Sequence, residues 1–138
     1  ESEAILVSEA NEMLAKAKEL KNSYPDAVVF AIGDFNSTAS GAVMQQLSAG
    51  GFVDAYALAV QKTDVCGFHG KPDFNSLKNA YDRYDATFPV DGYQYAIDHC
   101  MILGDAVKVE NYHTVTLRDA MLVSDHCPLL CRVYLGDS

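Results

Sequence analysis

The stretch Val28-Val29-Phe30-Ala31-Ile32-Gly33-Asp34-Phe35-Asn36 decides the fold prediction for the whole chain. Its five leading apolar residues predict a fully buried strand. That strand runs directly into a carboxylate and a carboxamide two positions apart, Asp34 and Asn36. If the chain is still extended there, these two side chains point to the same place. A buried strand that ends in paired polar side chains is a common way for α/β proteins to build a site.

Length and charge narrow the class of protein. The 138 residues are enough for one domain with a sizeable core. Nineteen acidic and ten basic residues give a net charge of −9, and the basic residues form no cluster. Proteins that hold long nucleic acids by their phosphates usually carry a basic stripe, so duplex DNA is disfavoured as a default partner. An acidic chain that handles phosphate needs a mediating cation, which fits oxygen ligands and Mg²⁺.

The cysteines and the apolar runs bear on the cellular compartment and on whether the chain spans a membrane. No apolar run approaches the length of a membrane span. Cys66, Cys100, Cys127 and Cys131 form no C-x-x-C pair, which favours buried free thiols over a Cys₄ zinc site. This usage favours a reducing, cytoplasmic compartment, with secretion left open. The sequence opens at Glu1, so the lack of a visible targeting segment indicates nothing.

The pattern of apolar residues places the other elements. Helical spacing predicts a surface helix from Ser2 to about Asn22. A shorter helix is predicted over residues 42–47, ended by a glycine pair. Residues 52–56 are expected to form a short strand or turn, and residues 61–87 a long loop. Further strands are predicted at Tyr95–Leu103, Val107–Thr116 and Leu129–Leu135.

Two more strand ends carry an acid next to a histidine. Asp98-His99 interrupts the buried pattern of the second strong strand, where an unpaired polar group would be costly. Asp125-His126 lies on the turn that leads into the last strand. Each site also has a plain structural explanation, because Asp34 could cap the serine-rich loop after it and Asp125-His126 could be a simple turn. Core packing alone does not require polar pairs at all three of these strand ends.

The ordered set of three motifs resembles the endonuclease/exonuclease/phosphatase superfamily, which has the deoxyribonuclease-I-like fold. The motifs are Gly33-Asp34-Phe35-Asn36, Ile97-Asp98-His99 and Ser124-Asp125-His126-Cys127-Pro128. Gly67-Phe68-His69-Gly70 is also similar to a loop that often precedes the second Asp motif in this family. The resemblance implies an α/β (α+β) fold: the C-terminal half of a four-layer α/β/β/α sandwich. We expect one mostly antiparallel or mixed sheet with helices on one face.

The resemblance further implies metal-dependent hydrolysis of a phosphoester, by a phosphodiesterase, nuclease or phosphatase. Asp34 would orient or deprotonate the attacking water, and together with Asp125 it would hold Mg²⁺ or Mn²⁺. Asn36 would hold the water or a phosphate oxygen. The remaining roles are implied as follows: Asp98 polarises His126, His126 stabilises the phosphate charge or moves a proton, and His99 contacts the phosphate.

The chain departs from the family pattern before Asp34. There the family supplies an Asn, a Glu that is the main metal ligand and another His or Tyr. The glutamates before Asp34 all lie on what reads as a surface helix: Glu1, Glu3, Glu9, Glu12 and Glu19. We therefore expect residues 1–138 to be a single partial domain, with weak metal binding and little turnover alone. A non-catalytic binding or interaction module on the same scaffold is the alternative. The substrate stays open, although the charge favours a small phosphoester over duplex DNA.

Half of such a domain would expose a large apolar sheet face, which soluble monomers rarely do. We expect the missing N-terminal half of a longer protein, or a second copy of the chain, to cover it. Analytical ultracentrifugation of the isolated 138 residues should therefore show self-association or poor folding. A well-folded, monodisperse species with the mass of one chain would contradict this expectation.

Overall fold

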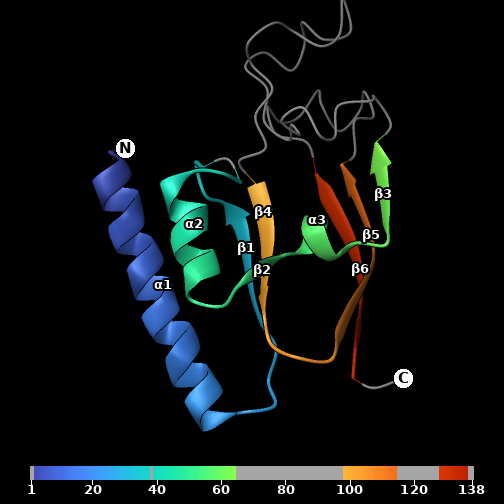
Figure 1. Ribbon diagram of the computed structural model, residues 1–138, viewed down its shortest axis with the longest axis horizontal. Coiled ribbons are helices and arrows are strands. Elements are labelled where there is room, and N and C mark those ends of the chain that lie inside the picture. Colours follow the sequence, from blue (N-terminus) through green and yellow to red (C-terminus); the bar gives the residue numbers. More distant parts are fainter. Residues whose placement is uncertain (1, 38, 65–97, 115–127, 137–138) are drawn as a thin grey trace, which may run out of the picture.

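The computed structural model describes residues 2–37, 39–64, 98–114 and 128–136. Over these ranges the chain forms two helices on one face of a three-stranded sheet and a second three-stranded sheet on the other (Figure 1). The predicted α/β class, with helices on one face, is confirmed. Within the described ranges no helix is long and apolar enough to cross a bilayer.

Helix α1, Glu3–Ser23, begins at a side-chain cap, and a lysine of its last turn contacts the chain that follows it. The hydroxyl of Ser2 accepts from the N–H of Ile5, as expected of an N-cap serine. At the other end, the ammonium of Lys21 lies 2.7 Å from the carbonyl oxygens of both Pro25 and Ala27. A cation there suits the negative end of the helix dipole and ties the helix to the chain entering the first strand. The helix predicted from Ser2 to about Asn22 is confirmed.

The first sheet has the strand order β1-β4-β2, and all of its pairing is antiparallel. Its strands are β1 Val29–Asp34, β2 Val53–Asp54 and β4 Asp98–Leu103. Helix α2, Ala42–Ala49, packs with α1 over this sheet and ends at Gly50, as the glycine pair predicted. The short helix α3, Ala55–Leu58, directly follows β2.

The second sheet has the order β3-β5-β6, so the strands that we expected in one sheet fall into two. Its strands are β3 Gln61–Asp64, β5 Val107–Thr114 and β6 Leu129–Leu135. The physical reason is that β1 and β2 already occupy both edges of β4, so β5 cannot pair beside it. Strand β3 occupies the first four residues of the predicted 61–87 loop and pairs parallel to β5. Residues 65–87 lie outside the described part.

A close turn carries the chain from β4 into β5. Gly104 has φ +152°, and a Cβ at this position would lie 3.1 Å from the Cα of Val28. Both the backbone conformation and the proximity of the neighbouring chain favour glycine here. This turn takes β5 out of the first sheet and into a second layer, over the face that α1 and α2 do not cover.

Strand β4 is buried on both sides. Met101 and Leu103 face α1 and α2, in a core that includes Leu47 at 0% exposure. Cys100 and Ile102 face the second sheet, in a core that includes Val109 and Tyr112 of β5. The alternation of side chains along a strand, which puts Cys100 and Ile102 on one face and Met101 and Leu103 on the other, accounts for these two cores.

Strand β1 is less buried than its composition predicted. It forms an edge of its sheet, and Phe30 and Ile32 are 37% and 71% exposed. Both pair in register with residues of β4 that face the second sheet, Ile102 and Cys100. The prediction of a fully buried strand is therefore wrong for the described chain, because the second sheet does not cover this edge. These exposed apolar side chains are consistent with our expectation of an apolar sheet face that another segment covers.

Cys100 of β4 and Cys131 of β6 carry free thiols and pack between the two sheets. A hydrogen bond between the thiols, with a further contribution from burial, raises the pKa of Cys131. The same hydrogen bond lowers the pKa of Cys100, although burial opposes it. The prediction of free thiols is confirmed for these two, and Cys66 and Cys127 lie outside the described residues.

The core under the helices should carry much of the stability. Truncating the fully buried Leu47 to alanine should cost about 2–5 kcal/mol, from lost apolar burial and the cavity left behind. The control is Ile5→Ala on α1, where the side chain is 53% exposed and the change should cost about 0.5 kcal/mol or less. Urea unfolding of the complete protein that contains this sequence measures both. Equal midpoints for the two variants would contradict this assignment of the core.

Candidate active site

The candidate site lies where β1 ends and β4 begins. Asp34, the last residue of β1, pairs in register with Asp98, the first residue of β4. Directly opposed residues in an antiparallel pair project from the same face, so both carboxylates lie on the face that is turned towards the second sheet. Like charges directly opposite each other destabilise a sheet. Sheet pairing alone therefore gives no reason for two acids here, which is what a functional site leads one to expect.

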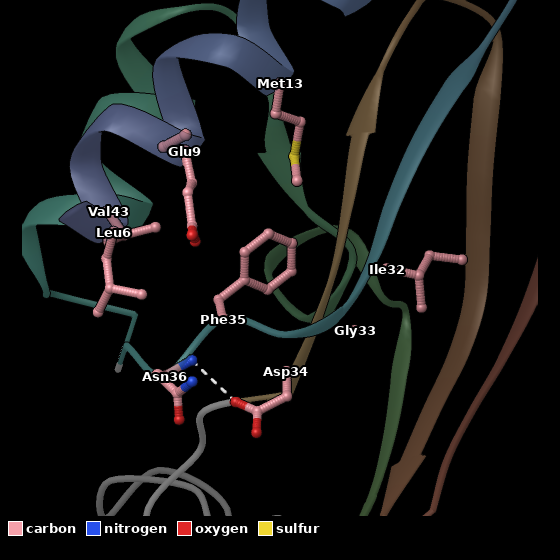
Figure 2. A pocket seen from close by; sticks show the side chains of 10 residues that line it. Leu6, Glu9, Met13, Ile32, Gly33, Asp34, Phe35, Asn36 and Val43 are labelled. Carbon is pink, nitrogen blue, oxygen red and sulfur yellow. Dashed lines mark hydrogen bonds between the residues drawn. The ribbon is translucent and has the colours of Figure 1, made fainter. Parts of the chain in front are cut away.

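A tight turn follows Asp34 and brings Asn36 back to it. The backbone N–H of Asn36 donates to Oδ1 of Asp34 at 2.8 Å (Figure 2). Asn36 has φ +50°, in the left-handed region that asparagine tolerates better than most residues. The extended geometry predicted for this pair is therefore wrong, because the chain turns at Asn36. A local turn, rather than the period of a strand, makes the two residues neighbours.

This turn also bears on the structural explanation for Asp34. One oxygen of its carboxylate accepts from the turn, as a capping role predicts. An ionised carboxylate offers about four acceptor positions on two oxygens. The turn therefore orients the Asp34 carboxylate.

His99 lies on the opposite face of β4 from Asp98 and is only 3% exposed. Its Nε2 lies 2.6 Å from the carbonyl oxygen of Ser37, and its Nδ1 lies 4.0 Å from Oδ2 of Asp54. The predicted contact of His99 with a substrate phosphate stays a prediction. Sequence reasoning missed Ser37 and Asp54. Asp54 before the short α3 carried an N-cap signal, but nothing in the sequence linked it to a histidine 45 positions later.

A cavity of about 320 Å³ lies beside the turn, between α1 and the end of β1. Figure 2 shows the Phe35 ring pointing into it, towards Met13 and Glu9 of α1, whereas the Asp34 carboxylate points away from it. The cavity is thus on the helix side of the strand. Asp34 and Asn36 form part of its rim, and it is a different space from the one expected between the catalytic groups.

The third predicted corner, Asp125 and His126, lies outside the described residues, so its pairing with Asp98 stays a prediction. Among the residues that the structure describes, no group of three or more His, Cys, Asp or Glu side chains could hold a metal ion. Mg²⁺ commonly binds through one or two carboxylates and keeps several waters. A single described carboxylate such as Asp34, at an exposed strand end, is compatible with that coordination.

The left-handed conformation of Asn36 predicts an unusual order of stability. Asn36→Gly should be more stable than Asn36→Ala by about 1 kcal/mol or more, because alanine is strained at positive φ. The control is Ser8 in the middle of α1, where alanine should be the more stable by about 0.5–1 kcal/mol. Denaturant unfolding of the four variants provides the comparison. Finding alanine equal to or better than glycine at position 36 would rule out this backbone conformation.

The comparisons with known proteins bear on the fold. No protein-family model matches the chain, and no curated protein matches its sequence. Solved structures do match. They include a mannosyl-6-phosphatase from Bacteroides thetaiotaomicron VPI-5482 (20% identity, TM-score 0.67, 94% of this chain and 46% of that one). An endonuclease/exonuclease/phosphatase from Bacteroides vulgatus matches with 20% identity and TM-score 0.69, over 98% of this chain and 46% of that one.

A truncated Caenorhabditis elegans TDP2 matches with 18% identity and TM-score 0.63, over 97% of this chain and 49% of that one. The chain thus spans about half the length of each of these structures. This share is consistent with the predicted half-domain. Over that half, the chain has the fold of endonuclease/exonuclease/phosphatase proteins, as the resemblance of its three motifs implied.

Proposed function

We propose that the complete protein is a divalent-metal-dependent phosphoester hydrolase of the endonuclease/exonuclease/phosphatase superfamily. In this proposal residues 1–138 form a single partial domain, the C-terminal half of the catalytic domain. The observation that carries it is the opposed pair Asp34 and Asp98, where β1 ends and β4 begins, next to the Asn36 turn. The matching structures, which include a mannosyl-6-phosphatase, support hydrolysis of phosphoesters in general.

Asp34 and Asp125 would hold Mg²⁺ or Mn²⁺, with further ligands from the part of the domain that this chain does not span. When bound, the cation offsets the charge that develops on the phosphoryl oxygens and helps to activate water. Two carboxylates suit Mg²⁺, which keeps several of its waters in protein sites.

The residues of this chain have distinct parts in the proposed reaction. The turn bond from Asn36 fixes the rotation of the Asp34 carboxylate, which would orient the attacking water and take its proton. The Asn36 amide holds that water or a phosphate oxygen. Asp98 accepts from the imidazole of His126 and fixes its tautomer. His126 then donates to the phosphate or to the departing oxygen.

The substrate class follows from charge. A chain with net charge −9 repels an extended polyanion, so the proposed substrate is a small phosphoester, a sugar phosphate or nucleotide rather than a duplex. Among the described basic residues, Arg132 pairs with Glu110 at 3.2 Å. The part of the domain outside this chain can alter that balance.

A non-catalytic binding module is the second candidate function. Two observations favour it: the Asp34 carboxylate accepts a hydrogen bond within its own turn, and the His99 ring is buried against a backbone carbonyl. Both are roles that acids and histidines play in stable structures without any chemistry. Turnover and its metal dependence separate the two candidates.

In the complete protein, Asp34→Asn and His126→Gln should each lower kcat/KM by about 10²–10⁴-fold, because each removes a proton-transfer group. EDTA should abolish turnover, and Mg²⁺ or Mn²⁺ should restore it. The substrates are bis-p-nitrophenyl phosphate and p-nitrophenyl phosphate, which separate diesterase from monoesterase activity. The control is Asp26→Asn, an exposed acid at the turn after α1, which should keep full activity.

Two results would overturn the proposal. The first is turnover that survives both EDTA and Asp34→Asn. The second is a folded, metal-loaded complete protein that hydrolyses neither compound nor any of a panel of sugar phosphates and nucleotides. The isolated 138 residues should show little turnover in the same assay.

A further inference from the structure

His99 is buried on the side of the sheet away from the two opposed carboxylates. The residue after it, Cys100, belongs to the core between the sheets, as does the face that carries Asp98. Met101, two residues beyond His99 and on its face, belongs to the core under the helices. A phosphate that contacts Asp34 and Asp98 would lie across the backbone of β4 from the His99 ring. The geometry therefore favours an indirect role for this imidazole.

The strongest polar contact of His99 goes to the backbone of the turn. Nε2 lies 2.6 Å from the carbonyl oxygen of Ser37, 62 positions earlier in the chain. A carbonyl oxygen only accepts, so Nε2 carries the proton and donates. Both residues are buried, at 3% and 9% exposure, so water does not compete well for this bond. Its loss would leave a buried carbonyl without this donor, which is costly in a site that water does not reach.

A second polar group, the Asp54 carboxylate, lies near the other ring nitrogen of His99. Nδ1 faces Oδ2 of Asp54 at 4.0 Å, while Oδ1 of the same carboxylate accepts from the N–H of Tyr56 at 2.9 Å. Asp54 is itself fixed as the N-cap of α3. The carboxylate therefore stands at a fixed position on the far side of the ring from Ser37, where it attracts Nδ1 when the imidazole is protonated.

These contacts enclose the strained residue of the candidate site. Asn36, with φ +50°, lies between Phe35 and Ser37. The Phe35 ring packs against the His99 ring with centroids 5.9 Å apart, and Ser37 accepts from Nε2. A residue in a sparsely populated conformation persists only where its surroundings over-determine it. His99 holds the chain on both sides of Asn36, and Asp34 holds its N–H.

We propose that His99 is a positioning residue: through the Ser37 carbonyl it holds the Asp34–Asn36 turn in the geometry that hydrolysis requires. The inference deepens the proposed function and rests on it for its catalytic consequence. Its structural content, that His99 determines the conformation of Asn36, can be tested without any turnover.

The test uses two substitutions, each of which replaces only one of the two ring nitrogens of the imidazole. In His99→Gln the amide nitrogen reaches the place of Nε2 and can still donate to Ser37. In His99→Asn the shorter side chain reaches only the place of Nδ1, so the bond to Ser37 is lost. In the complete protein, kcat should stay near wild type for His99→Gln and fall about 10–100-fold for His99→Asn, with KM unchanged in both.

A direct phosphate contact predicts a different result. Both substitutions remove the imidazole, so both should raise KM to a similar extent. Equal losses in the two variants, carried by KM, would therefore overturn the positioning role in favour of the direct contact.

The structural measurement is amide hydrogen exchange and the ¹⁵N–¹H chemical shift of Asn36. Both should be close to wild type in His99→Gln and changed in His99→Asn, with faster exchange because the bond to Asp34 weakens. An unchanged Asn36 signal in a folded His99→Asn variant would overturn the inference. If the protein proves not to be a hydrolase, this measurement still decides whether His99 positions the turn.

A milder variant covers the case in which His99→Asn does not fold. Asp54→Asn keeps a good N-cap for α3 and removes only the charge that faces Nδ1. It should shift the Asn36 resonance in the same direction as His99→Asn, by a smaller amount. A folded Asp54→Asn protein whose Asn36 resonance matches wild type would refute the positioning role.

Discussion

The antiparallel pairing of β1 with β4 is the constraint on which the rest of the structure depends. Six consecutive residue pairs, from Val29–Leu103 to Asp34–Asp98, hold the two strands in one register. A shift by one residue would turn the apolar side chains of β4 to the wrong faces, and both cores would lose their centre. The same register places two carboxylates opposite each other at one end of the paired strands. Core packing and the candidate site are therefore set by a single ladder of backbone hydrogen bonds.

The candidate site joins one local and one distant interaction. The bond from the Asn36 N–H to Asp34 spans two residues and forms from the chain's own turn chemistry. The bond from His99 to Ser37 spans 62 positions and exists only once β4 has paired with β1. A local turn of this kind is weak alone, and the buried imidazole supplies the additional constraint. Such over-determined strain is characteristic of sites where a carboxylate must keep one orientation.

Local patterns were enough for the elements that interact mainly along the chain. The spacing of apolar residues predicted α1, and Leu129–Leu135 was predicted with the bounds that β6 has. The ordered motifs also implied the fold that the matching structures share. The extended geometry at Asn36 was wrong, because a two-residue hydrogen bond competed with the strand. The burial of β1 was overestimated, because apolar composition does not tell an edge strand from a central one.

The sequence by itself determined the α/β class, most elements and the acids at the strand ends, because these depend on periodicity and on neighbours a few residues apart. Only the tertiary structure decided the division into two sheets, since β5 crosses to a second layer once both edges of β4 are occupied. It also decided the partners of His99, which meets Ser37 and Asp54 through strand pairing. Contacts between distant positions depend on register and on which edges are free, and neither property is encoded in a local pattern.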